Sequence, residues 1–323
     1  MKRFIFLIIS LMFLSSAFAL DSNYLSFRIT PQFTIANGVI NEYVFNEKCP
    51  NTNHKESQLD WDVKNIPLFQ GKAEFDILKF IRIEFNCSIA LPKSSGYMQD
   101  YDWLNYLYWP QDNPRDLTNY SKHDNKLLTY TTFSVGLGAN IRLPAEITIT
   151  PILAYYYEYI SFDGINGYKT YKIDNGEKIS FSGKVISYKQ EINDLLLGLA
   201  VRIETLPQFI FYADFFISPK VTSLNAMDYH YINDGTSGTA YWDSFQNIWQ
   251  LYTHANAQYK FNKFHSAGIS ASLQYIPIST GYTRTKGIDK DGHLNQGEWS
   301  KPSIGGGTGR LIWTLGLSYS FSL

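Results

Sequence analysis

The last segment of the chain alternates strictly between apolar and polar positions. From Leu311 to Leu323 every second residue is apolar, and the residues between them are mostly Thr, Gly and Ser. Successive side chains of a strand point to opposite faces, so this pattern predicts a β-strand with one apolar and one polar face. In a soluble sandwich the polar face would meet water. In a membrane β-barrel the apolar face meets lipid and the polar face lines the lumen.

The rest of the chain shows the same period in paired segments. We predict strands near residues 24–42, 58–75, 79–92, 128–142, 146–162, 181–204, 208–223, 246–261, 265–280 and 308–323. The connections alternate between short turns at 76–79, 143–145, 206–207 and 262–263 and long loops near 43–57, 93–127, 163–180, 224–245 and 281–307. About ten strands with this segregation of loop lengths are typical of a bacterial outer-membrane protein. The sequence therefore predicts an all-β, antiparallel transmembrane β-barrel with long extracellular loops and short periplasmic turns.

The N-terminal segment has the pattern of a secretory signal. Lys2 and Arg3 precede the apolar stretch 4–14, which is too short to span a bilayer, and Ala-Phe-Ala at 17–19 forms a cleavage site. We therefore predict a signal peptide over 1–19 and a single barrel domain over 20–323.

Composition excludes several other classes of protein. The aromatic content of 16% suits strands and the aromatic girdles of a membrane barrel. A net charge of −1 gives no reason to expect a nucleic-acid partner. Cys49 and Cys87 are too few for a disulfide framework, although they could pair in an oxidising envelope. No zinc spacing is present, and segment 287–294 has a glycine at the first ligand position of a calcium loop, so no metal is expected.

Two short segments carry the candidate chemistry. The first, Met-Gln-Asp-Tyr-Asp-Trp at 98–103, places Asp100 and Asp102 on one face of an extended chain, where two close acids should raise a pKa. The second places Asp228 two residues before His230, so that the carboxylate can fix the imidazole tautomer. Taken alone, each segment is better explained as a solvated loop. Together, facing each other across a barrel mouth, they could hold and deprotonate a water.

At these residues the chain resembles the omptin family, outer-membrane endopeptidases of Gram-negative bacteria built as ten-stranded barrels. The resemblance covers most of the mature chain and is densest at 57–61, 96–103, 121–123, 188–190 and 228–231. It implies that Asp100 and Asp102 hold a water against His230 and that Asp228 orients His230. The water would attack the peptide carbonyl directly, with activity falling as the pH drops through the imidazole pKa, about 6.5 when unperturbed.

The resemblance also assigns residues around this site. Ser121 and His123 match positions near it, where a supporting polar role suits them better than nucleophile and base. Glu42 matches the acid that binds the basic residue before the cut. Ala226 and Asn119 stand where the family has its other two specificity acids. We therefore expect only a weak preference for a basic residue before the cut and no requirement for a second one after it.

Family members require lipopolysaccharide, bound by basic residues on the outer wall. Here Glu191 and Ile160 replace two expected arginines, although Tyr156 and Glu158 are kept. Because a carboxylate cannot replace a cation at a phosphate site, we expect no dependence on lipopolysaccharide and no other cofactor. The expected partners are extracellular peptides or proteins and membrane lipid, with the protein a monomer in the outer membrane and its site facing outward.

Two alternatives remain open. A barrel of the same fold could bind host proteins as an adhesin without cleaving them, which the two missing acids favour and the four intact catalytic positions oppose. A pore is disfavoured, because side chains fill much of the lumen of a barrel of about ten strands.

Overall fold

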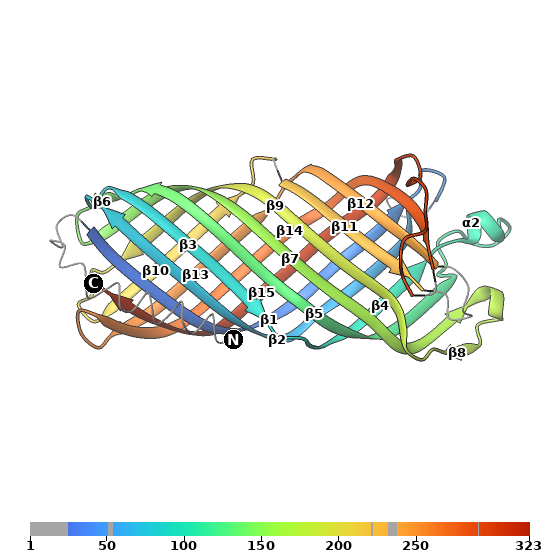
Figure 1. Ribbon diagram of the computed structural model, residues 1–323, viewed down its shortest axis with the longest axis horizontal. Coiled ribbons are helices and arrows are strands. Elements are labelled where there is room, and N and C mark those ends of the chain that lie inside the picture. Colours follow the sequence, from blue (N-terminus) through green and yellow to red (C-terminus); the bar gives the residue numbers. More distant parts are fainter. Residues whose placement is uncertain (1–24, 51–53, 221, 232–237, 290) are drawn as a thin grey trace.

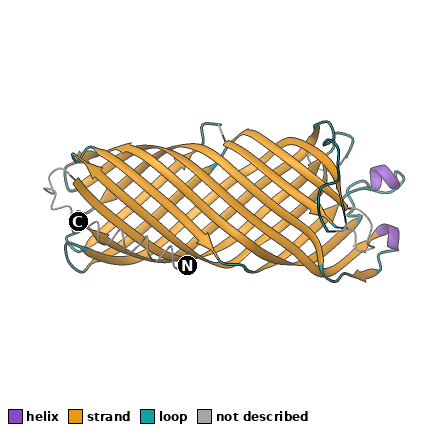
Figure 2. Ribbon diagram, in the orientation of Figure 1, coloured by secondary structure: helices purple, strands orange, loops and turns teal. Residues whose placement is uncertain are grey.

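The fold is a closed β-barrel, seen in a computed structural model that describes residues 25–50, 54–220, 222–231, 238–289 and 291–323 (Figures 1 and 2). The predicted signal peptide at 1–19 lies outside these ranges. Within them, no helix is both long and apolar enough to cross a membrane. The strands are β1 (Leu25–Phe45), β2 (Lys55–Ile77), β3 (Ile81–Ala90), β4 (Lys93–Asp102), β5 (Asn119–Ala139), β6 (Ile141–Leu143), β7 (Ile147–Tyr171), β8 (Lys178–Ser180), β9 (Lys184–Ile203), β10 (Phe209–Ile217), β11 (Thr222–His230), β12 (Gly238–Ile248), β13 (Leu251–Lys260), β14 (His265–Ile288) and β15 (Ser303–Ser322). Two short helices, α2 (Asn105–Tyr108) and the 3₁₀ helix η2 (Lys172–Asp174), lie in the loops.

The 15 strands form one antiparallel sheet that closes when β15 pairs with β1. In three places two successive strands share one position in the ring: β3 with β4, β10 with β11, and β12 with β13. With β6 continuing β5 and β8 extending beyond the ring from β7, the positions are β1, β2, β3/β4, β5, β7, β9, β10/β11, β12/β13, β14 and β15. The predicted ten-stranded barrel is therefore confirmed.

The strands run farther toward the long loops than the sequence predicts. The segments 93–127 and 224–245 were expected to be loops, but they contain β4, the start of β5, β11 and most of β12. These segments lack the regular apolar alternation of a lipid-facing strand because their outer faces lie beyond the apolar belt, and only some of their inner positions, such as Met98, Leu224 and Phe245, are apolar. The long strands carry the residues of the barrel mouth on paired backbone, whereas the short turns, such as 78–80 and 261–264, close the opposite end.

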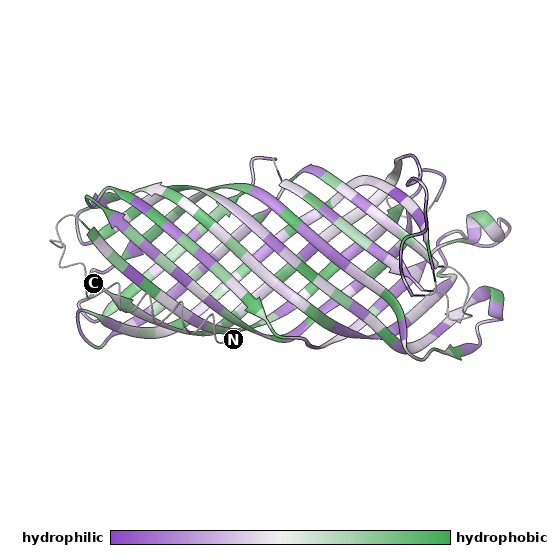
Figure 3. Cartoon of the chain, viewed as in Figure 1, coloured by the Kyte–Doolittle hydropathy of each residue, from purple (hydrophilic) through white to green (hydrophobic). Residues whose placement is uncertain are grey.

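An apolar belt surrounds the half of the barrel next to the short turns. Hydrophobic and hydrophilic residues alternate along the strands (Figure 3). The exposed large apolar side chains of the outer wall include Phe33, Phe69, Phe85, Phe133, Leu137, Leu153, Leu197, Phe215, Ile269, Leu315 and Leu317. All of them lie in the strand halves that adjoin the short turns, which is where lipid would contact the wall. The halves that adjoin the long loops therefore stand outside the membrane.

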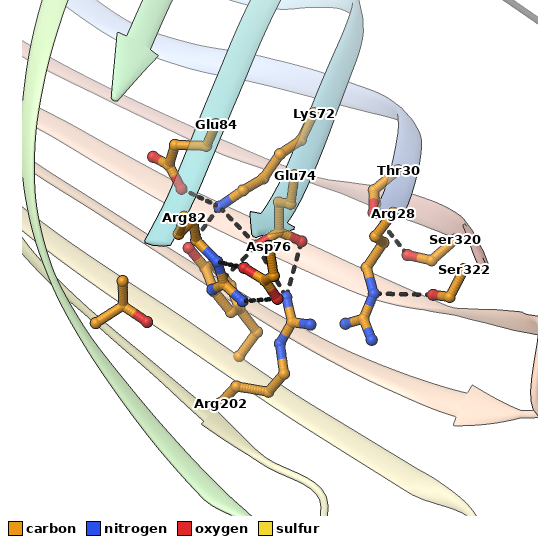
Figure 4. A network of polar contacts seen from close by, with 12 residues as sticks. Arg28, Thr30, Lys72, Glu74, Asp76, Arg82, Glu84, Arg202, Ser320 and Ser322 are labelled. Carbon is orange, nitrogen blue, oxygen red and sulfur yellow. Dashed lines mark hydrogen bonds and ion pairs between the residues drawn. The ribbon is translucent and has the colours of Figure 1, made fainter. Parts of the chain in front are cut away.

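Charged side chains fill the lumen at the level of the belt. Lys72 lies 3.4 Å from Glu84 and 3.9 Å from Glu74, and Arg202 bonds to Glu74 at 2.7 Å (Figure 4). Arg82 is 2% exposed and pairs with both Glu74 and Asp76. Ionised groups in a lumen stay paired because an unpaired buried charge is costly. This network blocks the barrel and argues against the pore alternative.

Two further layers lie between this network and the mouth. Arg310 pairs with Glu158 and also donates to Gln190 and Gln274. Nearer the mouth, Trp61 stacks on Tyr188 with ring centroids 5.3 Å apart and on Phe162 at 5.8 Å. The aromatic layer Trp61, Phe162 and Tyr188 forms the floor beneath the barrel mouth.

The two cysteines do not pair. Cys49 is buried in the first long loop and Cys87 is exposed on β3, and both are free thiols. The possible disulfide is therefore ruled out, since the two residues lie in different parts of the barrel.

Candidate active site

The two predicted motifs meet in one cavity at the mouth of the barrel. β4 carries Asp100 and Asp102, and β11 carries Asp228 and His230. All four line a cavity of about 1610 Å³, together with Glu42 of β1. Strand alternation turns each pair inward, so that Tyr101, the residue between the two acids, packs instead against Tyr120 with ring centroids 5.2 Å apart.

The Asp100 and Asp102 carboxylates are buried and lie near other acidic side chains. Ser57 donates to Oδ1 of Asp100 at 3.4 Å, and Asn119 donates to Oδ2 of Asp102 at 3.2 Å. Burial, followed by the charge of Asp102, raises the pKa of Asp100 well above its usual value. Burial also raises the pKa of Asp102. The expected pKa shift of the pair is therefore present, and the pair retains a proton more readily than an exposed carboxyl group does.

His230 is held by the carboxylate two residues before it. Its Nε2 atom hydrogen-bonds to Oδ2 of Asp228, which is 3% exposed. Burial lowers the pKa of His230, but the attraction of Asp228, its hydrogen bond, and the charges of Asp100 and Asp102 outweigh that effect and raise the pKa to about 9. The pH at which activity is expected to fall is therefore displaced upward from the unperturbed imidazole value, because neighbouring carboxylates stabilise the imidazolium.

A second group of acids lies beside this site. Glu42 is 4% exposed, and its Oε2 atom is buried without a hydrogen-bond partner. Asp243 of β12 also lines the cavity and accepts a hydrogen bond from Thr283 at 2.5 Å. Burial, then the charges of Asp228 and Asp243, raises the pKa of Glu42 well above its usual value, and burial raises that of Asp243 to about 7. In the described part of the chain, neither acid has a lysine or arginine within salt-bridge distance.

Four residues that the resemblance places at or near the substrate do not line the cavity. Ser121 and His123 are 3% and 2% exposed, and they hydrogen-bond to each other at 3.0 Å. Burial lowers the pKa of His123, and its Nδ1 atom contacts the backbone oxygen of Asn166. Asn119 turns its amide to Asp102, and Ala226 is 2% exposed. None of these four lines the cavity, so the geometry gives them supporting roles at most.

The residues expected at an outer lipopolysaccharide site are divided between the two faces of the wall. Tyr156, Glu158 and Ile160 are buried and point into the lumen, where Tyr156 donates to Glu158. Their assignment to an outer phosphate site is wrong, because alternate residues of β7 face inward. Glu191 of β9 does face outward and accepts a hydrogen bond from Asn193.

Several residues that line the cavity were not predicted from the sequence. They include Asp243, Tyr241, Tyr171, Leu107 and Tyr108. Asp243 and Tyr241 fall within a segment expected to be a loop, so strand alternation could not be used to find them. Leu107 and Tyr108 follow the Met-Gln-Asp-Tyr-Asp-Trp segment closely in sequence, and that proximity was the only available signal for them.

One cluster outside the cavity has the composition of a metal site. Among the described residues, Asp289, Asp291 and His293 form the one group of three whose ligand atoms lie within 4.8 Å of one another. Asp291 and His293 are exposed, and Oδ2 of Asp289 lies within hydrogen-bond distance of Nδ1 of His293, at 3.1 Å. Among the described residues, the acids of the cavity do not gather this closely.

Comparison with known proteins agrees with this architecture. The omptin family model matches residues 26–321. The chain is 27% identical over 316 residues to the plasminogen activator of Yersinia pestis, covering 92% of this chain and 90% of that protein. It is 23% identical over 151 residues to the outer membrane protease OmpP of Escherichia coli, covering 45% of this chain and 46% of that protein. The crystal structure of the outer membrane protease OmpT from Escherichia coli superposes with a TM-score of 0.77 at 21% identity, covering 92% of this chain and 97% of that one. The chain therefore belongs to the omptin family and has the fold of an outer-membrane β-barrel.

Proposed function

We propose that this protein is an outer-membrane endopeptidase that cleaves exposed peptides and proteins with a water activated by Asp100, Asp102 and His230. The observation that supports it is the meeting of β4 and β11, which places an acid pair and a carboxylate-bound imidazole on one cavity. The names of two relatives, a plasminogen activator and an outer membrane protease, agree with this class of activity.

The proposed reaction needs no covalent enzyme intermediate. A water held between the acid pair and His230 attacks the peptide carbonyl, and the proton it loses passes to the imidazole. The tetrahedral intermediate then collapses, and the amine leaves with a proton returned from the imidazolium. Asp228 keeps the ring oriented and stabilises its positive charge during the reaction. This assignment makes the enzyme an aspartyl-type protease with an essential histidine.

The cavity supports a basic residue before the cut and no basic residue after it. Glu42 offers a buried carboxylate oxygen without a partner, which suits a cationic side chain. Asn119 is uncharged and already bonded to Asp102, so it cannot bind a second cation. We also propose that the protein acts as a monomer, which is supported by the closed ring of strands because it leaves no open sheet edge for a second copy to pair with.

Cleavage of a peptide library by refolded protein in detergent micelles tests this function. We expect turnover in the parent and a loss of about 10²-fold or more in Asp100→Ala and His230→Ala. Asp60→Ala is the matched control, since Asp60 lies on the outer face of β2 and bonds to Asn41 and Gln58. A serine-directed fluorophosphonate should not label Ser121.

Two results would contradict the proposal. Full turnover in both variants would remove the assigned residues from the reaction. A correctly folded parent that binds peptides or host proteins but cleaves none would instead establish the adhesin alternative.

A further inference from the structure

Ala226 and Asp243 are directly opposed across the β11–β12 pair. Opposed residues of an antiparallel pair point to the same face. A carboxylate carried by Asp243 therefore projects on the same side of the wall as one carried by residue 226 would. Ala226 is 2% exposed and offers only a methyl group. Asp243 of β12 can therefore supply, on the same face, the carboxylate that β11 lacks at position 226.

The Asp243 side chain reaches across β14 toward β15. Thr283 of β14 donates to its Oδ1 atom at 2.5 Å. A Cβ atom added at Gly306 of β15 would lie 2.8 Å from the same oxygen. The absence of a side chain at Gly306 therefore makes room for this carboxylate, and the run of three glycines at 305–307 is part of β15.

Glu42 approaches the same part of β15 from the other side. It is the register partner of Thr308, two residues beyond Gly306 and on the same face. Residues two apart on a strand are separated by about 7 Å. The two carboxylates therefore lie over neighbouring inward positions of β15 and line the same cavity.

The spacing favours an extended organic cation over a metal ion. In the described ranges, no three acids of the cavity bring ligand atoms within 4.8 Å of one another, which one metal ion would need. A guanidinium group offers five donors in a planar fork and can bridge two carboxylates that are farther apart. Glu42 is 4% exposed and lines the cavity, and its buried Oε2 atom has no hydrogen-bond partner.

We propose that Asp243, together with Glu42, binds the arginine or lysine side chain of the substrate residue before the cut, in place of an acid at position 226. This inference rests on the proposed endopeptidase function and assigns its specificity. It also predicts a stronger basic preference than the sequence alone suggests, since two carboxylates rather than one would face the substrate.

The test compares two blocked peptides that differ only in arginine or citrulline before the cut. Citrulline keeps the shape of arginine and removes its charge, so the ratio of kcat/KM for the two peptides isolates recognition of the cation. We expect the parent to prefer arginine, and Asp243→Asn and Glu42→Gln each to reduce that ratio at least tenfold. Asp60→Asn, an acid-to-amide change on the outer face, should leave the ratio unchanged.

Relocating the acid separates recognition from a structural effect. Asp243→Ala should lose the preference for arginine, and adding Ala226→Asp to it should restore at least half of the lost ratio on a logarithmic scale. A ratio that is unchanged in Asp243→Asn, or one that the second substitution fails to restore, would overturn the inference.

The outcomes also separate this inference from the proposed function. Cleavage by the parent without preference for arginine would overturn the role of Asp243 and leave the endopeptidase function intact. If the parent cleaves neither peptide, the endopeptidase function fails. Calorimetric binding of the arginine peptide then decides the role of Asp243, which is upheld if Asp243→Asn weakens binding tenfold and rejected if it does not.

Discussion

The Nε2 atom of His230 hydrogen-bonds to Oδ2 of Asp228, two residues earlier on β11. This bond commits one ring nitrogen to a carboxylate and leaves Nδ1 as the nitrogen that can exchange a proton with water. The same contact sets the pH at which the imidazole can act as a base.

The activity should rise with pH along a limb near 9. Only the neutral imidazole accepts a proton, and the nearby carboxylates raise the pKa of His230 to about 9, so the active form is depleted below that pH. Asp228→Asn removes the largest of the interactions that raise this pKa. In that variant the limb of kcat/KM should move toward 6.5 while the rate itself falls. A limb that does not move would exclude His230 as the base.

Asn119 should affect the rate rather than substrate binding. Its amide donates to Asp102 but does not line the cavity. Asn119→Ala should therefore lower kcat about tenfold, as expected for one hydrogen bond to a charged group, with KM nearly unchanged. Asn119→Asp should lower kcat further, because it places a like charge beside Asp102. Steady-state kinetics test both, with Gln99→Ala, an outer-face amide on β4, as the control.

The Arg310–Glu158 pair should be essential for stability. Both side chains are fully buried in the lumen, so Arg310→Met leaves Glu158 without its cation. We expect the free energy of unfolding in urea to fall by about 3–5 kcal/mol. Combining Arg310→Met with Glu158→Gln should recover part of the lost free energy, because the double variant leaves no unpaired charge. Equal losses in the single and double variants would show that packing, rather than charge, is responsible.

Lipopolysaccharide should not be required for activity. Glu191 places a carboxylate on the outer face of β9 where a phosphate group would need a cation. Delipidated, refolded protein in neutral detergent should therefore cleave its peptides at the rate seen after lipopolysaccharide is added. Activity that appears only after the addition would refute this expectation. Glu191→Arg offers a second measurement, since it should create a response to lipopolysaccharide where the parent has none.

The fold could be predicted from the sequence where lipid imposes a pattern. Apolar and polar residues alternate from Leu311 to Leu323 because one face of β15 contacts hydrocarbon. The short turns could be predicted because they connect neighbouring antiparallel strands. Above the membrane that constraint ends, so the sequence predicts loops where β4 and β12 form. Their polar faces meet water or other polar side chains, and no hydropathy pattern distinguishes them from irregular chain.

The site could be predicted in part for a similar reason. Asp100 with Asp102, and Asp228 with His230, are local i, i+2 pairs, so a short segment contains the whole relationship. Asp243 and Ala226 are partners only through the register of β11 with β12, which the sequence of either strand leaves open. The inward orientation of Glu158 likewise depends on which residues of β7 face the lumen.

The aromatic layer of Trp61, Phe162 and Tyr188 has an electrical consequence. Tyr188 lies within electrostatic reach of Glu42 on one side and of Arg310 on the other. The positive charge of Arg310 is already balanced by its pairing with Glu158 below the layer. Any negative charge on the acids of the cavity is therefore balanced from the outer side of the barrel, and an arriving cationic peptide can supply that balance.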